Sequence, residues 1–171
     1  MTAVYLSIGS NIDRARNVFS AAQSLRDAFS QVIFSPVYQC APIGFDGDDF
    51  YNLAAQFDSS LSPEEIHWKL REIESEHGRR RGRARFASRE LDLDILLYGE
   101  STIEAEEFAI PRADIIEYAF VLKPLCDIAS NVRHPTIGKS IGELWYAMSE
   151  GRRMEQDLRQ VEIDLNIAEP A

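Results

Sequence analysis

The stretch Leu91–Gly99 constrains the fold of this chain more than any other. Every second position in it is leucine or isoleucine, Asp92 and Asp94 fall between them, and a glycine ends the run. This period of two indicates a β-strand, in which alternate side chains share a face at a rise of about 3.3 Å per residue. Two carboxylates on one face are suitable ligands for a hard divalent cation, although an exposed strand face that only aids solubility is the alternative. The residues expected on the opposite, apolar face are Leu91, Leu93, Ile95 and Leu97.

An arginine-rich segment leads directly into this strand. The chain carries a net charge of −10, which opposes broad electrostatic binding of nucleic acid. A local cationic loop on an acidic protein suits a small polyanion instead, and arginines beside a carboxylate pair fit phosphoryl transfer with Mg²⁺. The alternative is a solvated loop whose arginines pair with nearby acidic residues. The six arginines are Arg79, Arg80, Arg81, Arg83, Arg85 and Arg89.

The other patterns predict an α+β fold. Ser62-Pro63-Glu64-Glu65 is a capping box with proline at the first helical position, and Gly78 is a suitable end for that helix. The predicted order β-α-β-β-α-β is the ferredoxin-like sandwich, with a mainly antiparallel sheet and helices packed on one face. The other predicted elements are strands at 3–8, 31–38 and 50–57 and a helix over 18–29.

The C-terminal part predicts further, less regular structure. A helix or turn is expected around 114–118 and a helix within 137–148. From Val161 to Ile167 apolar residues alternate with polar ones, which indicates an added strand that extends the sheet or pairs between chains. We therefore divide the chain into a main domain, residues 1–148, and a C-terminal extension, residues 149–171.

Several classes of protein are not supported by the sequence. No apolar run is long enough to span a membrane, no secretory signal is visible, and Cys40 and Cys126 have no CxxC spacing, so a cytoplasmic protein is expected. Motifs of P-loop enzymes, zinc proteases and serine hydrolases do not occur. Aromatic residues beside the predicted loops could sandwich a flat heterocycle whose edge Asn52 would read, although core packing is the more common role of such residues.

Together these residues resemble the 6-hydroxymethyl-7,8-dihydropterin pyrophosphokinase family. The most specific match is the signature R-x-x-x-R-x-L-D-L-D-I-L over residues 85–96. The supporting matches are Ile8–Asn11, Tyr38–Gly44, Phe50–Asn52, Glu74, Gly78–Arg79, Ile110–Pro111 and Phe120–Leu125.

The resemblance implies transfer of pyrophosphate from ATP to the hydroxymethyl group of the dihydropterin, with release of AMP. It implies a chain that binds ATP and the dihydropterin, with two Mg²⁺ ions held by Asp92 and Asp94. We expect a monomer or weak dimer. The implied catalytic residues are Arg79, Arg89, Asp92 and Asp94. The implied pterin-binding residues are Cys40, Ile43, Phe50, Asn52 and Phe120. The implied nucleotide-binding residues are Glu74, Arg79, Arg81, Phe86, Arg89 and Arg112.

Two positions depart from the family pattern at the expected adenosine end. Arg112 stands where the family usually has histidine, and Tyr118 where it usually has arginine. A divergent paralogue with weak or no kinase activity, which binds pterin or nucleotide, is therefore one alternative. A ferredoxin-like module that binds RNA through its arginine loop is a second.

Overall fold

The computed structural model of the chain describes residues 1–78, 88–148 and 150–166. Its first half follows the predicted order, except that the second strand is split in two. The elements are β1 Thr2–Ser10, α1 Arg14–Phe29, β2 Ile33–Phe34, β3 Val37–Cys40, β4 Phe50–Ser59, α2 Pro63–Glu76 and β5 Asp92–Tyr98.

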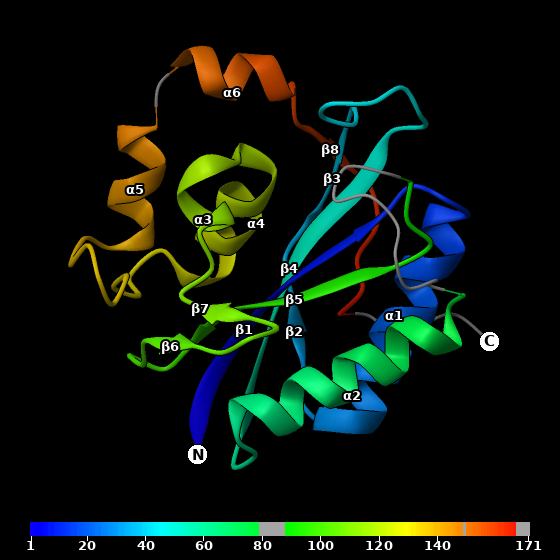
Figure 1. The fold of residues 1–171 in the computed structure, drawn as a ribbon. Helices are drawn as coiled ribbons and strands as arrows, with labels where there is room; N and C mark the ends of the chain where they lie inside the picture. The colour runs from blue at the N-terminus through cyan, green and yellow to red at the C-terminus, as the bar shows by residue number, and fades with distance from the viewer. Residues whose placement is uncertain (79–87, 149, 167–171) are drawn as a thin grey trace.

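These strands form one antiparallel sheet in the order β5-β1-β4-β3, with β2 also paired to β4. The strand β1 therefore lies between β4, which carries Phe50 and Asn52, and β5, which carries Asp92 and Asp94 (Figure 1). The predicted ferredoxin-like α+β fold is confirmed.

The interruption of the second strand has a local cause. Pro36 has no N–H and cannot donate a hydrogen bond to β4. Ser35 takes over the pairing at this point, because its backbone N–H donates to the carbonyl of Ala54 at 2.9 Å and its hydroxyl accepts the N–H of Ala54 at 2.8 Å. The second strand is thus β2 and β3 on either side of Pro36.

The helix α2 begins as predicted. The Ser62 hydroxyl accepts the backbone N–H of Glu65, and the Glu65 carboxylate accepts the backbone N–H of Ser62, which completes the capping box. After the helix, Gly78 has a φ of 85°, which glycine adopts without steric penalty.

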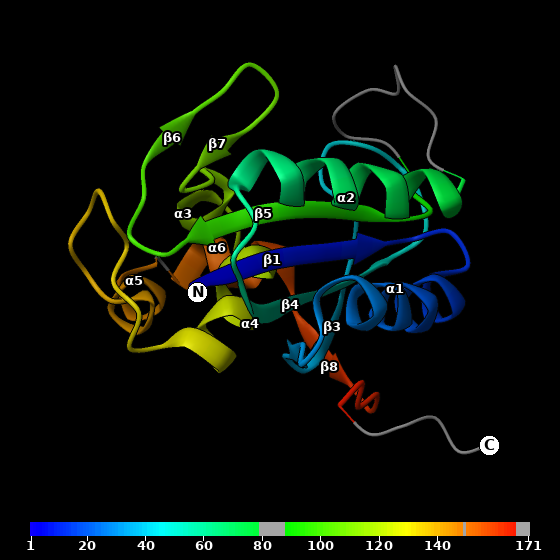
Figure 2. The ribbon, with the colours of Figure 1, turned by 90° about the horizontal axis from the view of Figure 1, so that it is seen from below.

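Helices cover both faces of the sheet, so the expectation of helices on one face alone was wrong. The helices α1 and α2 pack on one face, whereas α3 to α6 lie on the other (Figures 1 and 2). A two-stranded sheet, β6 with β7, lies between β5 and α3. These elements are β6 Ile103–Glu104, β7 Ala109–Ile110, α3 Asp114–Glu117, α4 Ala119–Ala129, α5 Ile141–Ala147 and α6 Glu150–Gln156.

A β-bulge changes the predicted alternation in β5. Tyr5 of β1 pairs with Leu97 and Leu6 pairs with Ile95, which leaves Leu96 as the extra residue. Ile95 packs toward α1 and α2, whereas Leu97 packs with the second layer of helices. The prediction that Leu97 shares a face with Ile95 was therefore wrong, and the bulge lies beyond the two aspartates.

The C-terminal extension adds a strand to the same sheet, in a different place from the prediction. β8, Arg159–Val161, pairs antiparallel with β3, and the predicted strand over 161–167 overlaps it only at Val161. Leu165 is buried in the core instead of alternating in a strand, and the Asn166 side chain bonds the backbone N–H and carbonyl of Phe34, each at 2.9 Å. The division at residue 148 stays a prediction. Within the described ranges, no helix has the length and apolar composition needed to cross a membrane.

Candidate active site

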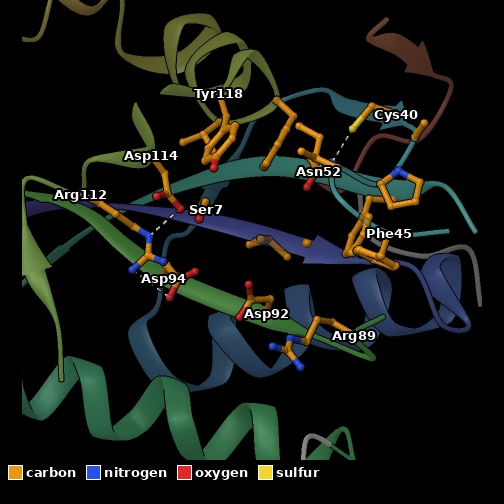
Figure 3. A pocket seen from close by; sticks show the side chains of 18 residues that line it. Ser7, Cys40, Phe45, Asn52, Arg89, Asp92, Asp94, Arg112, Asp114 and Tyr118 are labelled. Atoms are coloured by element: carbon orange, nitrogen blue, oxygen red, sulfur yellow. Dashed lines mark hydrogen bonds and ion pairs between the residues drawn. The ribbon is translucent and has the colours of Figure 1, made fainter. Parts of the chain in front are cut away.

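A pocket opens over the middle of the sheet, at the face covered by α3 and α4 (Figure 3). Side chains from β3, β4 and β5, from the segment 41–49 and from the segment 112–121 line it. Gly9 of β1, the strand between β4 and β5, adds no side chain. The pocket brings together nine of the predicted site residues: Cys40, Ile43, Phe50, Asn52, Arg89, Asp92, Asp94, Arg112 and Phe120.

The acidic end of the pocket is the predicted carboxylate pair. Asp92 and Asp94 both point into the pocket from β5, while Leu93 between them is buried in the core beneath the sheet. Two guanidinium groups flank Asp94: Arg112 Nη1 and Arg71 Nη2 each lie 3.6 Å from Oδ1. The alternation read from the sequence therefore predicted this arrangement, but not the arginine that reaches Asp94 from α2.

Burial and, to a smaller extent, the neighbouring charge of Asp92 raise the pKa of Asp94 to about 6, against the opposing effect of Arg112 and Arg71. A further cation bound between Asp92 and Asp94 would reduce the repulsion between the two carboxylates. No group of three or more His, Cys, Asp or Glu side chains suited to a metal occurs in the part of the chain that the structure describes. The two carboxylates that point into the pocket fit Mg²⁺, because Mg²⁺ takes one or two carboxylates and completes its shell with phosphate oxygens and water.

The raised pKa of Asp94 predicts a pH dependence of stability in the absence of divalent cations. The folded protein holds the proton up to about pH 6, whereas the unfolded chain releases it near 3.8. The folded state therefore binds more protons in this window, and the Asp94 contribution to stability is present at low pH and lost as pH rises through 6.

We expect the free energy of unfolding of the wild type, minus that of Asp94→Asn, to fall by about 1–3 kcal/mol between pH 4 and pH 7. Urea titrations at several pH values, with EDTA present, measure this difference. A difference that rises with pH would contradict the assignment of the raised pKa to Asp94.

Next to this pair, Asp114 makes a contact with Arg112 that the sequence did not predict. Arg112 Nε donates to Asp114 Oδ2 at 3.0 Å, so Arg112 lies between Asp94 on β5 and Asp114 at the start of α3. All three side chains line the pocket. Arg112 is therefore held beside the carboxylate pair, where a polyanion bound by that pair would meet its positive charge.

The opposite end of the pocket is less charged and holds Asn52. Its side chain is 7% exposed, and Nδ2 donates to the Cys40 sulfur at 3.1 Å. Burial raises the pKa of the Cys40 thiol to about 12, so the thiol stays protonated and is no nucleophile. A Cβ at Gly9 would lie 3.2 Å from Asn52 Oδ1, which shows how closely the amide approaches β1.

Aromatic rings enclose this end of the pocket in two pairs. Phe45 meets Phe50 edge to face, with ring centroids 6.3 Å apart and planes at 88°. Tyr118 stacks on Phe120 with centroids 5.0 Å apart and planes at 19°. Phe50 and Phe120 were among the implied pterin-binding residues. Phe45 and Tyr118, which pack against them, were not, because both lie in irregular segments where the sequence has no periodic pattern.

Of the other four predicted site residues, the structure describes Glu74. Glu74 does not line this pocket: it is 1% exposed, its Oε1 lies 2.8 Å from Arg71 Nε, and its Oε2 accepts the backbone N–H of Leu93 at 3.3 Å. Its predicted contact with the nucleotide stays a prediction. Arg79, Arg81 and Phe86 lie outside the described residues.

Comparison with known proteins identifies a family that matches most of this chain. A family model described as 7,8-dihydro-6-hydroxymethylpterin-pyrophosphokinase matches residues 5–130. The 2-amino-4-hydroxy-6-hydroxymethyldihydropteridine pyrophosphokinase of Pseudomonas aeruginosa is 38% identical over 148 residues, which are 82% of this chain and 88% of that protein.

Longer relatives contain this region as one part. The folic acid synthesis protein fol1 of Pneumocystis carinii is 37% identical over 142 residues, which are 81% of this chain but 19% of fol1. The crystal structure of Plasmodium falciparum HPPK-DHPS with pteroate aligns with a TM-score of 0.75 at 12% identity, over 95% of this chain and 46% of that one, and supports the fold. The match to the family model and the identity over most of the Pseudomonas enzyme show that this chain belongs to the 7,8-dihydro-6-hydroxymethylpterin-pyrophosphokinase family.

Proposed function

We propose that this chain transfers pyrophosphate from ATP to 6-hydroxymethyl-7,8-dihydropterin, which yields AMP and the dihydropterin pyrophosphate for folate synthesis. One observation carries the proposal. A single pocket joins an acidic end, with Asp92, Asp94 and the guanidinium of Arg112, to an amide and aromatic end around Asn52. The first end suits metal-bound phosphates, and the second suits a flat heterocycle with hydrogen-bonding edges.

The reaction forms a bond from the hydroxymethyl oxygen to the β-phosphorus and breaks the bond from that phosphorus to the oxygen shared with the α-phosphate. AMP leaves, and the hydroxyl proton is released. Asn52 and the stacked rings hold the heterocycle so that its hydroxymethyl group faces β5, which makes the attack intramolecular in effect. Arg89 and Arg112, which both line the pocket, offset phosphate charge as the bond to the leaving group breaks.

We propose that Asp92 and Asp94 hold Mg²⁺ together with the phosphates of ATP. When bound, the metal neutralises phosphate charge and lowers the pKa of a coordinated hydroxyl group. The raised pKa of Asp94 supports this role. It reflects in part the repulsion between Asp94 and Asp92, which a cation shared by the two carboxylates would reduce.

The test is a coupled assay for AMP formation from ATP and 6-hydroxymethyl-7,8-dihydropterin with Mg²⁺. AMP formation that requires both substrates would support the proposal. Binding of the pterin in the presence of α,β-methylene-ATP and Mg²⁺, without any AMP from ATP, would overturn it in favour of a non-catalytic paralogue. Omitting Mg²⁺ tests the metal, because turnover that persists in EDTA would exclude it.

Arg112 is expected to contribute to binding of the nucleotide and not of the pterin. Its guanidinium lies beside the carboxylate pair, far from the amide of Asn52 (Figure 3). We expect Arg112→Ala to raise the KM for ATP about tenfold or more, the effect of one lost charge-assisted hydrogen bond, with the KM for the pterin within about twofold of wild type. Arg159→Ala, whose side chain is 76% exposed on β8, is the matched control. Equal changes in both KM values would contradict a nucleotide role.

We further propose a cytoplasmic location, where ATP and a reduced pterin are available, and a monomer or weak dimer in solution. The free cysteines Cys40 and Cys126 support a reducing environment.

A further inference from the structure

Asn11 lies at the end of β1 and between two segments that reach opposite ends of the pocket. Its side chain is buried, with 3% exposed. The first segment is residues 41–49, here called the flap, which contributes Ala41, Pro42, Ile43 and Phe45 to the aromatic end. The second is residues 88–90, here called the Arg89 turn, which contributes the Arg89 side chain to the acidic end.

The amide of Asn11 bonds both segments at once. Its Oδ1 accepts the backbone N–H of Arg89 at 2.7 Å, and its own backbone N–H donates to the Arg89 carbonyl at 3.0 Å. Its Nδ2 donates to the carbonyl of Asp48 in the flap at 3.0 Å and to the Ser88 hydroxyl at 3.2 Å. The acceptor therefore holds the Arg89 turn, and the donor group joins that turn to the flap.

The flap and the Arg89 turn are also in close proximity to each other. A Cβ at Gly47 would lie 3.3 Å from the Ser88 hydroxyl and 2.9 Å from the Phe45 ring. Arg14 Nη1 donates to the carbonyl of Asp49 at 2.7 Å and anchors the end of the flap to α1. A shift of the Arg89 turn would thus be passed to the flap through the hydrogen bonds of Asn11.

We propose that Asn11 is a positioning residue that couples the two ends of the pocket, so that nucleotide and pterin strengthen each other's binding. This inference rests on the proposed function. A nucleotide that fixes Arg89 also fixes the Asn11 amide, and with it Asp48 and the flap. The pterin then binds a flap that is already ordered, and by thermodynamic linkage the pterin improves nucleotide binding by the same factor.

Two substitutions distinguish the contact of Asn11 with the Arg89 turn from its contact with the flap. Asn11→Ala removes all side-chain bonds. Asn11→Asp keeps an oxygen that accepts the Arg89 N–H, but a carboxylate cannot donate to the Asp48 carbonyl. The matched control is Asn166→Ala, because Asn166 also bridges two segments, with two hydrogen bonds to the backbone of Phe34, yet it does not line the pocket.

The first measurement is the dissociation constant of 6-hydroxymethylpterin with and without saturating α,β-methylene-ATP and Mg²⁺. In wild type and Asn166→Ala we expect the nucleotide to tighten pterin binding at least about fivefold. In Asn11→Ala and Asn11→Asp the factor should fall to about one, and Asn11→Asp should bind nucleotide within about threefold of wild type. An unchanged factor in Asn11→Ala, or no coupling in the wild type, would overturn the proposal.

The second measurement separates this inference from the proposed function. Hydrogen exchange of the Arg89 backbone amide should be at least about tenfold faster in Asn11→Ala and near wild type in Asn11→Asp, with the β1 and β4 amides unchanged. Wild-type protein that binds neither probe would refute the proposed function. Faster exchange at Arg89 would then still support the link through Asn11, and unchanged exchange would overturn it.

Discussion

Replacement of either carboxylate on β5, by Asp92→Asn or Asp94→Asn, is expected to slow AMP formation about 100- to 1,000-fold or more while the chain stays folded. The amide keeps the shape of the side chain but loses the charge that a metal and two neighbouring arginines require. Folding should survive because Asp94 holds its proton up to about pH 6 in the folded state, so a neutral group fits this site. Steady-state assays at saturating ATP and pterin measure the loss, and circular dichroism checks the fold.

The control for this pair is Asp58→Asn. Asp58 is an exposed carboxylate on β4 that does not line the pocket, so its loss should leave turnover within about twofold of wild type. Titration calorimetry with Mg²⁺ and α,β-methylene-ATP adds a reading that does not depend on turnover. If Asp92→Asn and Asp94→Asn bound the metal–nucleotide complex as the wild type does, or formed AMP at a near-normal rate, the metal assignment would be wrong.

The carboxylate pair could be predicted from the sequence because strand geometry is local. Leu93 separates Asp92 from Asp94, and the period of two holds as long as no bulge intervenes. The bulge at Leu96 could not be predicted from the sequence. Ile95, Leu96 and Leu97 are all apolar, and because helices cover both faces of the sheet, each of them could be buried on either face. The shared face of Asp92 and Asp94 was therefore predicted correctly, because it lies on the side of the bulge where polar and apolar residues alternate.

In the second layer of helices, α4 could not be predicted because of its own composition. α4 contains Pro124, and proline removes a helical hydrogen bond and usually ends the pattern. The helix packs against both the sheet and α5, so most of its surface is apolar. It therefore lacks the regular spacing of polar and apolar residues by which an amphipathic helix is predicted. Asp114 and Tyr118 enter the pocket only because this layer positions them, so the contacts of Arg112 required the three-dimensional fold.

Substitution of Glu74 is expected to have the largest effect on stability. Glu74 Oε1 lies 2.8 Å from Arg71 Nε and its Oε2 accepts the N–H of Leu93, so the buried carboxylate joins α2 to β5 at Leu93, between the two aspartates. Breaking a buried ion pair leaves the partner's charge poorly compensated, and we expect Glu74→Ala to lower the free energy of unfolding by about 3–5 kcal/mol. Urea unfolding measures this loss. Glu72→Ala, at an exposed position of the same helix, should change it by less than about 0.5 kcal/mol.

This substitution also decides what Glu74 does, because the two roles predict different results. A residue that supports β5 should lose stability when replaced, and Glu74→Gln should recover part of it, since the amide oxygen still accepts the Leu93 N–H. The nucleotide role implied by the sequence predicts a raised KM for ATP in Glu74→Gln with wild-type stability. Arg71 links Glu74 to the pocket, because its Nη2 lies 3.6 Å from Asp94, so a displaced Arg71 should also alter the pKa of Asp94. A stability loss together with a changed pH dependence would place Glu74 beneath the site as its support, and a change in the KM for ATP alone would place it among the nucleotide ligands.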